Sequence, residues 1–371
     1  MPAEQNFWDG LFGAKPGPSD GVRVEMRLLK KHGRPLLLLP CHPRAAVATL
    51  SLYPAQTPRA RAARALLSGL LRFSAPYGTE PLSLAIPPDD AFVKFLAQLV
   101  GAPPGELPPF GILPGNPASE GQRFLVLVFD AAQRPVFVVK AGLTQPARAL
   151  IEQEQYFLKA APPDTAGLPK LRATFECPRL LALALDFFPG DSPRKRQERA
   201  IPSLLGSWLN AKRKISVSET ACWQALERSC PGDALLVTTG LRERIVQAAV
   251  QHGDFAPWNI KVSPGGDWRV LDWERGQVTG LPGWDWFHYL IQTALLVERQ
   301  PAAALVERVE NLLSSESFRS YATQSGLRGS DRESVLAYLL HTVHVVKPSE
   351  GLPQTQELLK ALCERWPKRS G

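Results

Sequence analysis

Short runs of apolar residues, some alternating with polar ones, recur through the first half of the chain and predict β-strands. The expected strands cover residues 22–29, 35–39, 45–52, 110–113, 123–129, 136–140, 173–176 and 180–185. A polar turn at 130–135 joins two of these strands and predicts a hairpin. Pro146 favours the first turn of a helix, which we expect to run to about Ala160.

The second half of the chain is mostly helical in its pattern, with one interruption. Residues 259–262 and 268–272 flank the turn at 263–266 and predict a short extended pair. A Pro-rich connector at 102–109 marks an expected boundary, because such segments rarely continue a helix or strand. The pattern predicts an N-terminal accessory domain of mixed α/β type at 1–104, a sheet-rich part at 105–189 and a helical part at 190–371.

Residues 57–73 have the pattern of an amphipathic helix. One face carries Ala and Leu at positions 62, 66, 67, 70 and 71, and the opposite face carries Arg61, Arg64 and Arg72. Such a helix can pack its leucines inward and expose its arginines, which is the usual arrangement on a domain surface. It can also lie on an anionic membrane as a weak peripheral contact. The pattern alone leaves both interpretations open.

Composition restricts the class of protein. A chain of 371 residues is too long for one ordinary core, so we expect more than one domain. The formal net charge of +8 favours anionic partners in general, and nothing else indicates a specific nucleic-acid partner. The five cysteines are scattered with no C-x-x-C pair, which fits a reducing, cytoplasmic environment. We expect no signal peptide, because the N-terminus carries acidic residues and no apolar stretch. We expect no spanning segment, because no apolar run approaches the roughly 20 residues required.

The strongest chemical signal is the stretch His-Gly-Asp-Phe-Ala-Pro-Trp-Asn at 252–259, followed by Leu-Asp-Trp-Glu at 271–274. Phosphoryl transfer from Mg-ATP needs a carboxylate beside the attacking hydroxyl and hard oxygen ligands for the metal. The spacing places Asp254 as the group that accepts the hydroxyl proton. Asn259 and Asp272, at the two ends of the extended pair, are the expected Mg²⁺ ligands.

A lysine and a glutamate are expected to meet in the preceding sheet-rich part. Lys140 shares a strand face with apolar residues 136 and 138, where a cation is costly unless it meets an anion. Glu154 lies within the apolar stripe of the following helix. We expect a buried ion pair that directs Lys140 at nucleotide phosphates.

Together, Lys140, Glu154, the H-G-D-F-x-P-x-N motif and L-D-W-E resemble the aminoglycoside phosphotransferase and choline kinase branch of the protein-kinase-like superfamily. The resemblance covers residues 105–286. It implies an α+β, bilobal fold with an antiparallel-sheet N-lobe and a mainly helical C-lobe, here preceded by an extra N-terminal block. It also implies binding of ATP or GTP with Mg²⁺. The roles that it implies are adenine binding by backbone groups around Asp186, Phe187 and Phe188, support of the catalytic loop by His252, and bracing of that loop by Asp285.

The acceptor and the phosphate-covering loop are less defined. The N-terminal block and residues 280–288 resemble a bacterial subgroup associated with surface-polysaccharide synthesis, which implies a sugar or glycan acceptor. The loop at 115–121 departs from the glycine-rich pattern, because Pro117 removes a backbone donor and Glu120 adds a negative charge. Ser119 is a candidate phosphate contact there.

The expected function is transfer of the γ-phosphoryl group to a hydroxyl of a small molecule, sugar or glycan. The alternative is a catalytically weak pseudokinase that senses nucleotide or acts as a scaffold in glycan assembly.

Overall fold

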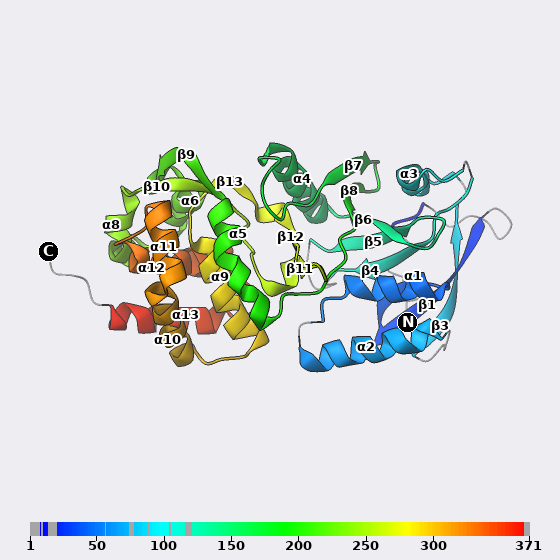
Figure 1. Cartoon of the computed structure of the whole chain (residues 1–371). Coiled ribbons are helices and arrows are strands. Elements are labelled where there is room, and N and C mark those ends of the chain that lie inside the picture. Colours follow the sequence, from blue (N-terminus) through cyan, green and yellow to red (C-terminus); the bar gives the residue numbers. More distant parts are fainter. Residues whose placement is uncertain are drawn as a thin grey trace. The chain divides into compact units, whose positions relative to one another are not determined.

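The computed structural model describes residues 8, 10–13, 21–55, 57–73, 78–87, 89–103, 105–115 and 121–366 (Figure 1). The chain forms two compact units. Unit 1 comprises Met1–Lys159 and Pro169–Asp191, and unit 2 comprises Ala160–Leu168 and Ser192–Gly371. The expected fold class is confirmed, because an antiparallel sheet fills the first unit and helices dominate the second.

Unit 1 is built on one antiparallel sheet of eight strands in the order β3-β1-β2-β4-β5-β6-β8-β7. The strands are β1 (Val22–Lys31), β2 (Arg34–Pro40), β3 (Thr79–Ile86), β4 (Phe110–Pro114), β5 (Arg123–Phe129), β6 (Pro135–Gly142), β7 (Leu171–Glu176) and β8 (Leu181–Asp186). The helices are α1 (Pro43–Thr49), α2 (Pro58–Arg72), α3 (Ala91–Val100) and α4 (Gln145–Ala160).

The N-terminal block is not separated from the sheet-rich part that follows it. Leu38 of β2 pairs with Ile112 of β4, so the strands of 1–104 and 105–189 form a single sheet. The Pro-rich connector turns the chain between α3 and β4 without ending the domain. Unit 1 ends at Asp191, and residues Ala160–Leu168 of the 105–189 part belong to unit 2.

One expected strand is wrong. Residues 45–52 form helix α1 and a 3₁₀ turn at Leu50–Leu52. Pro43 lies in the first turn of α1, and the alanines that follow favour a helix over a strand. The run of small apolar residues resembles the pattern of a strand. In the structure, Ala45, Ala46 and Thr49 are buried on one side of this short helix.

The two faces of the sheet bury different side chains, because consecutive strand residues point in opposite directions. One face packs against α1 and α2 through Leu37, Leu39, Leu127 and Phe129. The other face packs against α3 and the N-terminal segment through Leu38, Ile112, Val126 and Val128. The sheet therefore carries apolar residues on both faces and is covered on both.

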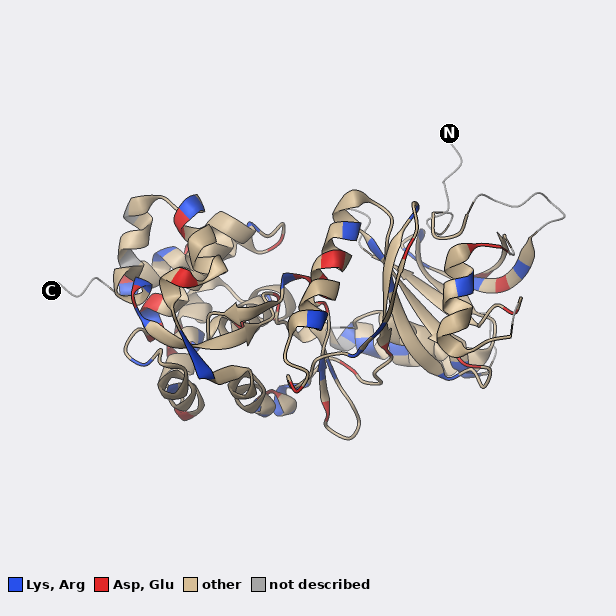
Figure 2. Cartoon of the chain, turned by 90° about the horizontal axis from the view of Figure 1, so that it is seen from above, with Lys and Arg blue, Asp and Glu red and all other residues tan. Residues whose placement is uncertain are grey.

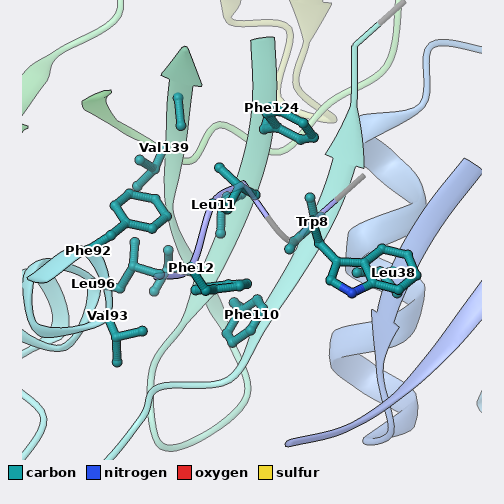
Figure 3. Packing of buried hydrophobic residues seen from close by; sticks show 14 of the residues in the cluster. Trp8, Leu11, Phe12, Leu38, Phe92, Val93, Leu96, Phe110, Phe124 and Val139 are labelled. Carbon is teal, nitrogen blue, oxygen red and sulfur yellow. The ribbon is translucent and has the colours of Figure 1, made fainter. Parts of the chain in front are cut away.

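The N-terminal segment is part of this second core (Figure 3). Trp8, Leu11 and Phe12 are buried there, and the Phe12 ring lies 5.6 Å from that of Phe110. Asp90 anchors the segment, since its Oδ2 accepts hydrogen bonds from the backbone of Gly13 at 2.7 Å and from Arg179 at 2.8 Å. Its Oδ1 caps helix α3 by accepting from the backbone of residues 92 and 93.

We expect Asp90→Ala to destabilise unit 1 by about 2–4 kcal/mol, because it removes a helix cap and leaves Arg179 without its buried carboxylate. Asp89→Ala is the matched control. Its side chain is exposed and pairs only across the surface with Lys94, so the expected change is below about 0.5 kcal/mol. Urea unfolding of both variants measures the difference. Equal midpoints for the two variants would contradict this role of Asp90.

Helix α2 confirms the amphipathic helix expected at 57–73, but its leucines do not all pack inward. Leu71 is buried, whereas Leu66 is 69% exposed and Phe73, at the end of the helix, is 87% exposed. On a helical wheel these two residues lie together with Ala62 on the solvent side. Arg59 borders this exposed strip on one side, and Arg61 and Arg72 border it on the other.

Unit 2 is mainly helical. Its helices are α5 (Ile201–Ser207), α6 (Ala221–Ser229), α7 (Gly232–Leu235), α8 (Thr239–Arg242), α9 (Trp284–Gln292), α10 (Ala302–Ser314), α11 (Glu316–Ser325), α12 (Asp331–His341) and α13 (Leu352–Arg365). The expected extended pair is confirmed as β11 (Ile260–Val262) and β12 (Trp268–Val270). Among the described residues, no helix is both long and apolar enough to cross a bilayer.

The expectation of a single extended interruption in the second half is wrong. A three-stranded antiparallel sheet is formed by β9 (Leu209–Ser216), β10 (Ile245–Gln251) and β13 (Gln277–Gly280) in the order β13-β10-β9. The edge strand β9 exposes five consecutive residues, including Lys212, Arg213 and Lys214, so it lacks the apolar pattern of a strand. Basic and acidic segments are otherwise interspersed over both units (Figure 2).

Candidate active site

The backbone of the loop after β10 hydrogen-bonds to a buried carboxylate. Asp285, in the first turn of α9, accepts a hydrogen bond from the backbone of His252 at 2.7 Å and from that of Gly253 at 3.0 Å. Gly253 has a φ of +78°, and a side chain there would meet the Arg275 carbonyl. Burial raises the pKa of Asp285, although the hydrogen bonds from the two backbone donors oppose the shift. Asp285 thus determines the backbone path into Asp254.

His252 links this loop to the segment that carries Asp272. Its Nδ1 accepts from the backbone N–H of Asp254 at 3.1 Å, so its Nε2 carries the proton and donates to the Leu271 carbonyl at 2.7 Å. The ring is fully buried and packs edge-on against Trp273, with centroids 4.6 Å apart. These contacts are those of the supporting residue expected at this position.

Asp254 and Asn259 are joined directly. The Nδ2 group of Asn259 donates to the Asp254 carbonyl and to Asp254 Oδ2, both at 2.9 Å. Because both contacts use the amide nitrogen, the orientation of the Asn259 side chain leaves Oδ1 as its atom for a metal. The 3₁₀ turn at Pro257–Asn259 carries this side chain to the start of β11.

The β11–β12 hairpin brings the second expected metal ligand to the same end. Ile260 pairs with Val270, and the Leu271 N–H donates to the Asn259 carbonyl at 2.7 Å. Asp272 follows directly and has φ +63° and ψ 60°, in the left-handed region. This conformation costs a non-glycine residue about 1–3 kcal/mol, and such residues are enriched at functional sites. An amide oxygen and a carboxylate fit the preference of Mg²⁺ for hard oxygen ligands.

In unit 1 the expected ion pair is confirmed. Lys140 Nζ lies 2.7 Å from both carboxylate oxygens of Glu154. The two residues are 4% and 0% exposed, respectively. Glu154 shares the buried face of α4 with Ala147, Ile151 and Phe157, which holds the carboxylate beneath β6. The lysine on the strand is thereby fixed in position by a carboxylate from the adjacent helix.

Two groups at the end of β8 already have hydrogen-bond partners within the protein. The Phe187 N–H donates to the Val136 carbonyl at 2.8 Å, so this donor extends the β6–β8 pairing and is not available to an adenine. The Asp186 carboxylate pairs with Arg172, with one N–O distance of 2.7 Å. Adenine binding by Asp186 or Phe188 remains a prediction. Ser119 lies outside the described residues.

The structure adds two residues that the sequence analysis missed. His288 Nε2 lies 3.0 Å from Asp254 Oδ1, and His288 Nδ1 lies 3.0 Å from the hydroxyl of Tyr338. His288 is on α9 and Tyr338 is on α12. The sequence could have indicated His288, because it follows Asp285 by three residues on a helix and therefore lies on the same helix face as Asp285.

The contact with His288 changes the acidity of Asp254. Burial raises the pKa of the Asp254 carboxyl, but the hydrogen bond from His288 and the nearby charge of Arg275 outweigh burial and lower it. The carboxylate therefore stays ionised.

His341 lies on the same helix as Tyr338, and its ring packs on that of Trp284 with centroids 5.0 Å apart. Burial together with the charge of Arg275 lowers the pKa of His341 to about 4. His341 is therefore neutral at physiological pH and packs against the tryptophan ring.

No protein-family model and no curated protein sequence matches the chain. Solved structures with a similar fold include aminoglycoside phosphotransferase APH(4)-Ia, at 12% identity over 74% of this chain and 98% of that one, with a TM-score of 0.48. A complex of a thermostable mutant of that enzyme with ADP and hygromycin B matches at 13% identity over 75% and 99% of the two chains, with a TM-score of 0.46.

Choline kinase LicA from Streptococcus pneumoniae matches at 16% identity over 65% of this chain and 89% of that one, with a TM-score of 0.41. These neighbours are of the branch that the sequence motifs resemble. TM-scores below 0.5 do not establish a shared activity, so the chemistry of this chain must follow from its own side chains.

Proposed function

We propose that this protein is an ATP- and Mg²⁺-dependent phosphotransferase whose acceptor is a hydroxyl of a small molecule, sugar or glycan. The observation that carries the proposal is the arrangement around Asp254. An ionised carboxylate is held by Asn259, whose amide oxygen remains for a metal, and the β11–β12 hairpin brings Asp272 to the same end. A carboxylate base beside two hard oxygen ligands is the requirement of phosphoryl transfer.

The residues divide the chemistry among them. Asp254 orients the acceptor hydroxyl and takes its proton while the acceptor oxygen bonds to the γ-phosphorus. The bond from that phosphorus to the ADP oxygen breaks in the same step. Asn259 and Asp272 would hold Mg²⁺, which when bound neutralises charge on the phosphates. Lys140, held by Glu154, would contact phosphate oxygens. His252 and Asp285 would maintain the conformation of the loop that carries Asp254.

Nucleotide binding is the first expected consequence. Mg-ATP at 100 times its dissociation constant adds about 2.7 kcal/mol of stability, which raises the melting temperature by several degrees. We expect Asp272→Asn to remove this rise, because it removes a charged metal ligand. Asp267→Asn, in the exposed turn of the same hairpin, makes the same charge change and should keep the rise.

Thermal unfolding with Mg-ATP and with Mg-GTP measures both the binding and the choice of nucleotide. A magnesium-dependent rise that is absent in Asp272→Asn supports the site and justifies an acceptor screen that begins with sugars. Absence of any rise at millimolar nucleotide would contradict the proposed function. Binding without any transfer would instead favour the alternative, a nucleotide-sensing pseudokinase or scaffold.

We also propose a peripheral contact between α2 and an anionic lipid surface. The strip formed by Ala62, Leu66 and Phe73 faces solvent, is bordered by arginines on both sides, and α2 contains no acidic residue. Exposed apolar side chains flanked by cations are the arrangement of helices that lie in a lipid interface. Charge complementarity selects anionic over neutral lipid.

Sedimentation with vesicles tests this contact. We expect the protein to bind vesicles of phosphatidylcholine with 30% phosphatidylserine by about tenfold more than pure phosphatidylcholine, with the difference lost at high salt. The double change Leu66→Ser and Phe73→Ser should abolish binding. Leu236→Ser, which removes an exposed leucine in unit 2, is the control and should bind as wild type. Equal binding by both variants would exclude α2 as the contact.

A further inference from the structure

Asp254 is held at both carboxylate oxygens by side chains from two different elements. Oδ2 accepts from Asn259 of its own loop, and Oδ1 faces Nε2 of His288 on α9. A carboxylate oxygen can only accept, so His288 Nε2 carries the hydrogen of that bond. Rotation of the carboxylate is thereby restrained from two directions, and each oxygen retains one lone pair for the acceptor hydroxyl.

Helix α9 contacts the loop twice through one face. Asp285 accepts from the backbone at 252 and 253, and His288, one turn further along, reaches the side chain at 254. The first contact sets the path of the backbone and the second sets the side chain. The helix therefore determines both the position and the orientation of the Asp254 carboxylate.

Tyr338 fixes the imidazole itself. Its hydroxyl lies 3.0 Å from His288 Nδ1, and the ring is buried on α12. Burial and the nearby acidic residues Asp254 and Asp285 raise the pKa of Tyr338, so the phenol keeps its proton. His288 thus accepts from the tyrosine at Nδ1 and donates to the carboxylate from Nε2. The chain Tyr338–His288–Asp254 is continuous, and the His288 side chain is only 12% exposed.

We infer that His288, oriented by Tyr338, is a positioning residue that holds the Asp254 carboxylate for the incoming hydroxyl. This inference rests on the proposed function, since Asp254 acts as a base only in that reaction. His288 itself contacts neither the nucleotide nor the acceptor in this scheme, so its effect should fall on the rate of transfer and not on the binding of Mg-ATP.

The activity test uses water as the acceptor, with release of inorganic phosphate from Mg-ATP as the measurement. We expect His288→Ala to lower kcat by about 10- to 100-fold with the KM for Mg-ATP changed less than about twofold. His288→Gln can still donate an N–H toward Oδ1 and should remain within about fivefold of wild type. Tyr338→Phe, which removes only the hydroxyl, should lower kcat by about three- to tenfold.

His341→Gln is the matched control, because it replaces a half-buried histidine on α12 whose ring packs against Trp284. It should leave kcat unchanged. Melting temperatures of all variants separate loss of positioning from loss of fold. If Asp254→Ala abolishes phosphate release while His288→Ala behaves as wild type, the inference is overturned and the proposed function stands.

A second measurement does not depend on turnover. The imidazole nitrogen resonances of His288 in a ¹⁵N-labelled protein should shift when Asp254 is replaced by Asn, and those of His341 should not. A shift at His288 supports the contact even if neither phosphate release nor stabilisation by Mg-ATP is found in any variant, an outcome that would overturn the proposed function alone. Unchanged His288 resonances in Asp254→Asn would overturn the inference whatever the activity.

Discussion

Replacement of Asp254 by Ala should lower phosphotransfer by at least about 10³-fold, because the acceptor hydroxyl loses both its proton acceptor and the group that orients it. The fold of unit 2 should persist. The loop is held by Asp285 through backbone groups and by His252 through the Leu271 carbonyl, and neither contact uses the Asp254 side chain. The measurement is the rate of phosphate transfer at saturating Mg-ATP, with melting temperature as the test of folding.

Asp267→Ala provides the control for Asp254→Ala. Asp267 lies in the exposed turn between β11 and β12 and hydrogen-bonds to Ser263 within that turn. We expect wild-type activity from this variant. Retention of near wild-type transfer in Asp254→Ala would exclude Asp254 as the base and with it the mechanism proposed above.

Replacement of Lys140 by Met should produce the second large effect, on both stability and activity. The change leaves the fully buried Glu154 without its cation, which costs about 3–5 kcal/mol when one partner of a buried pair is removed. Activity should fall by about 100-fold or more, because the phosphates lose a positively charged contact.

The double variant Lys140→Met with Glu154→Leu separates these two effects. Replacing both partners of a buried ion pair by apolar residues of similar volume is often neutral for stability. We therefore expect the double variant to regain most of the lost stability in urea unfolding and to remain inactive. Recovery of activity together with stability would show that Lys140 serves the fold alone.

Local pattern was enough to predict much of unit 1, including the Lys140–Glu154 ion pair. Strand parity placed Lys140 on an apolar face, and helical periodicity placed Glu154 on the buried stripe of α4, so their pairing could be expected. The spacing of Asp254, Asn259 and Asp272 around a short hairpin was also enough to predict that Asn259 and Asp272 lie at the same end of it. A tight turn determines which residues of the two strands lie opposite each other.

Local pattern misleads where a short helix is made of small apolar residues or where a strand lies at an edge. Residues 45–52 form a helix because alanine propensity outweighs a short apolar alternation. Strand β9 was missed because its exposed basic residues hide the strand pattern. Such edges tolerate charge, since only one side of the strand is paired.

The sequence by itself determined which faces of their own elements the candidate residues occupy. Only the tertiary structure decided which distant residues meet them. His288 lies 34 positions after Asp254, and Tyr338 lies a further 50 positions along the chain. The strands of the N-terminal block join the later strands through the single pairing of β2 with β4. Periodicity reports the direction of a side chain within its element, whereas contacts between elements depend on the packing of the whole unit.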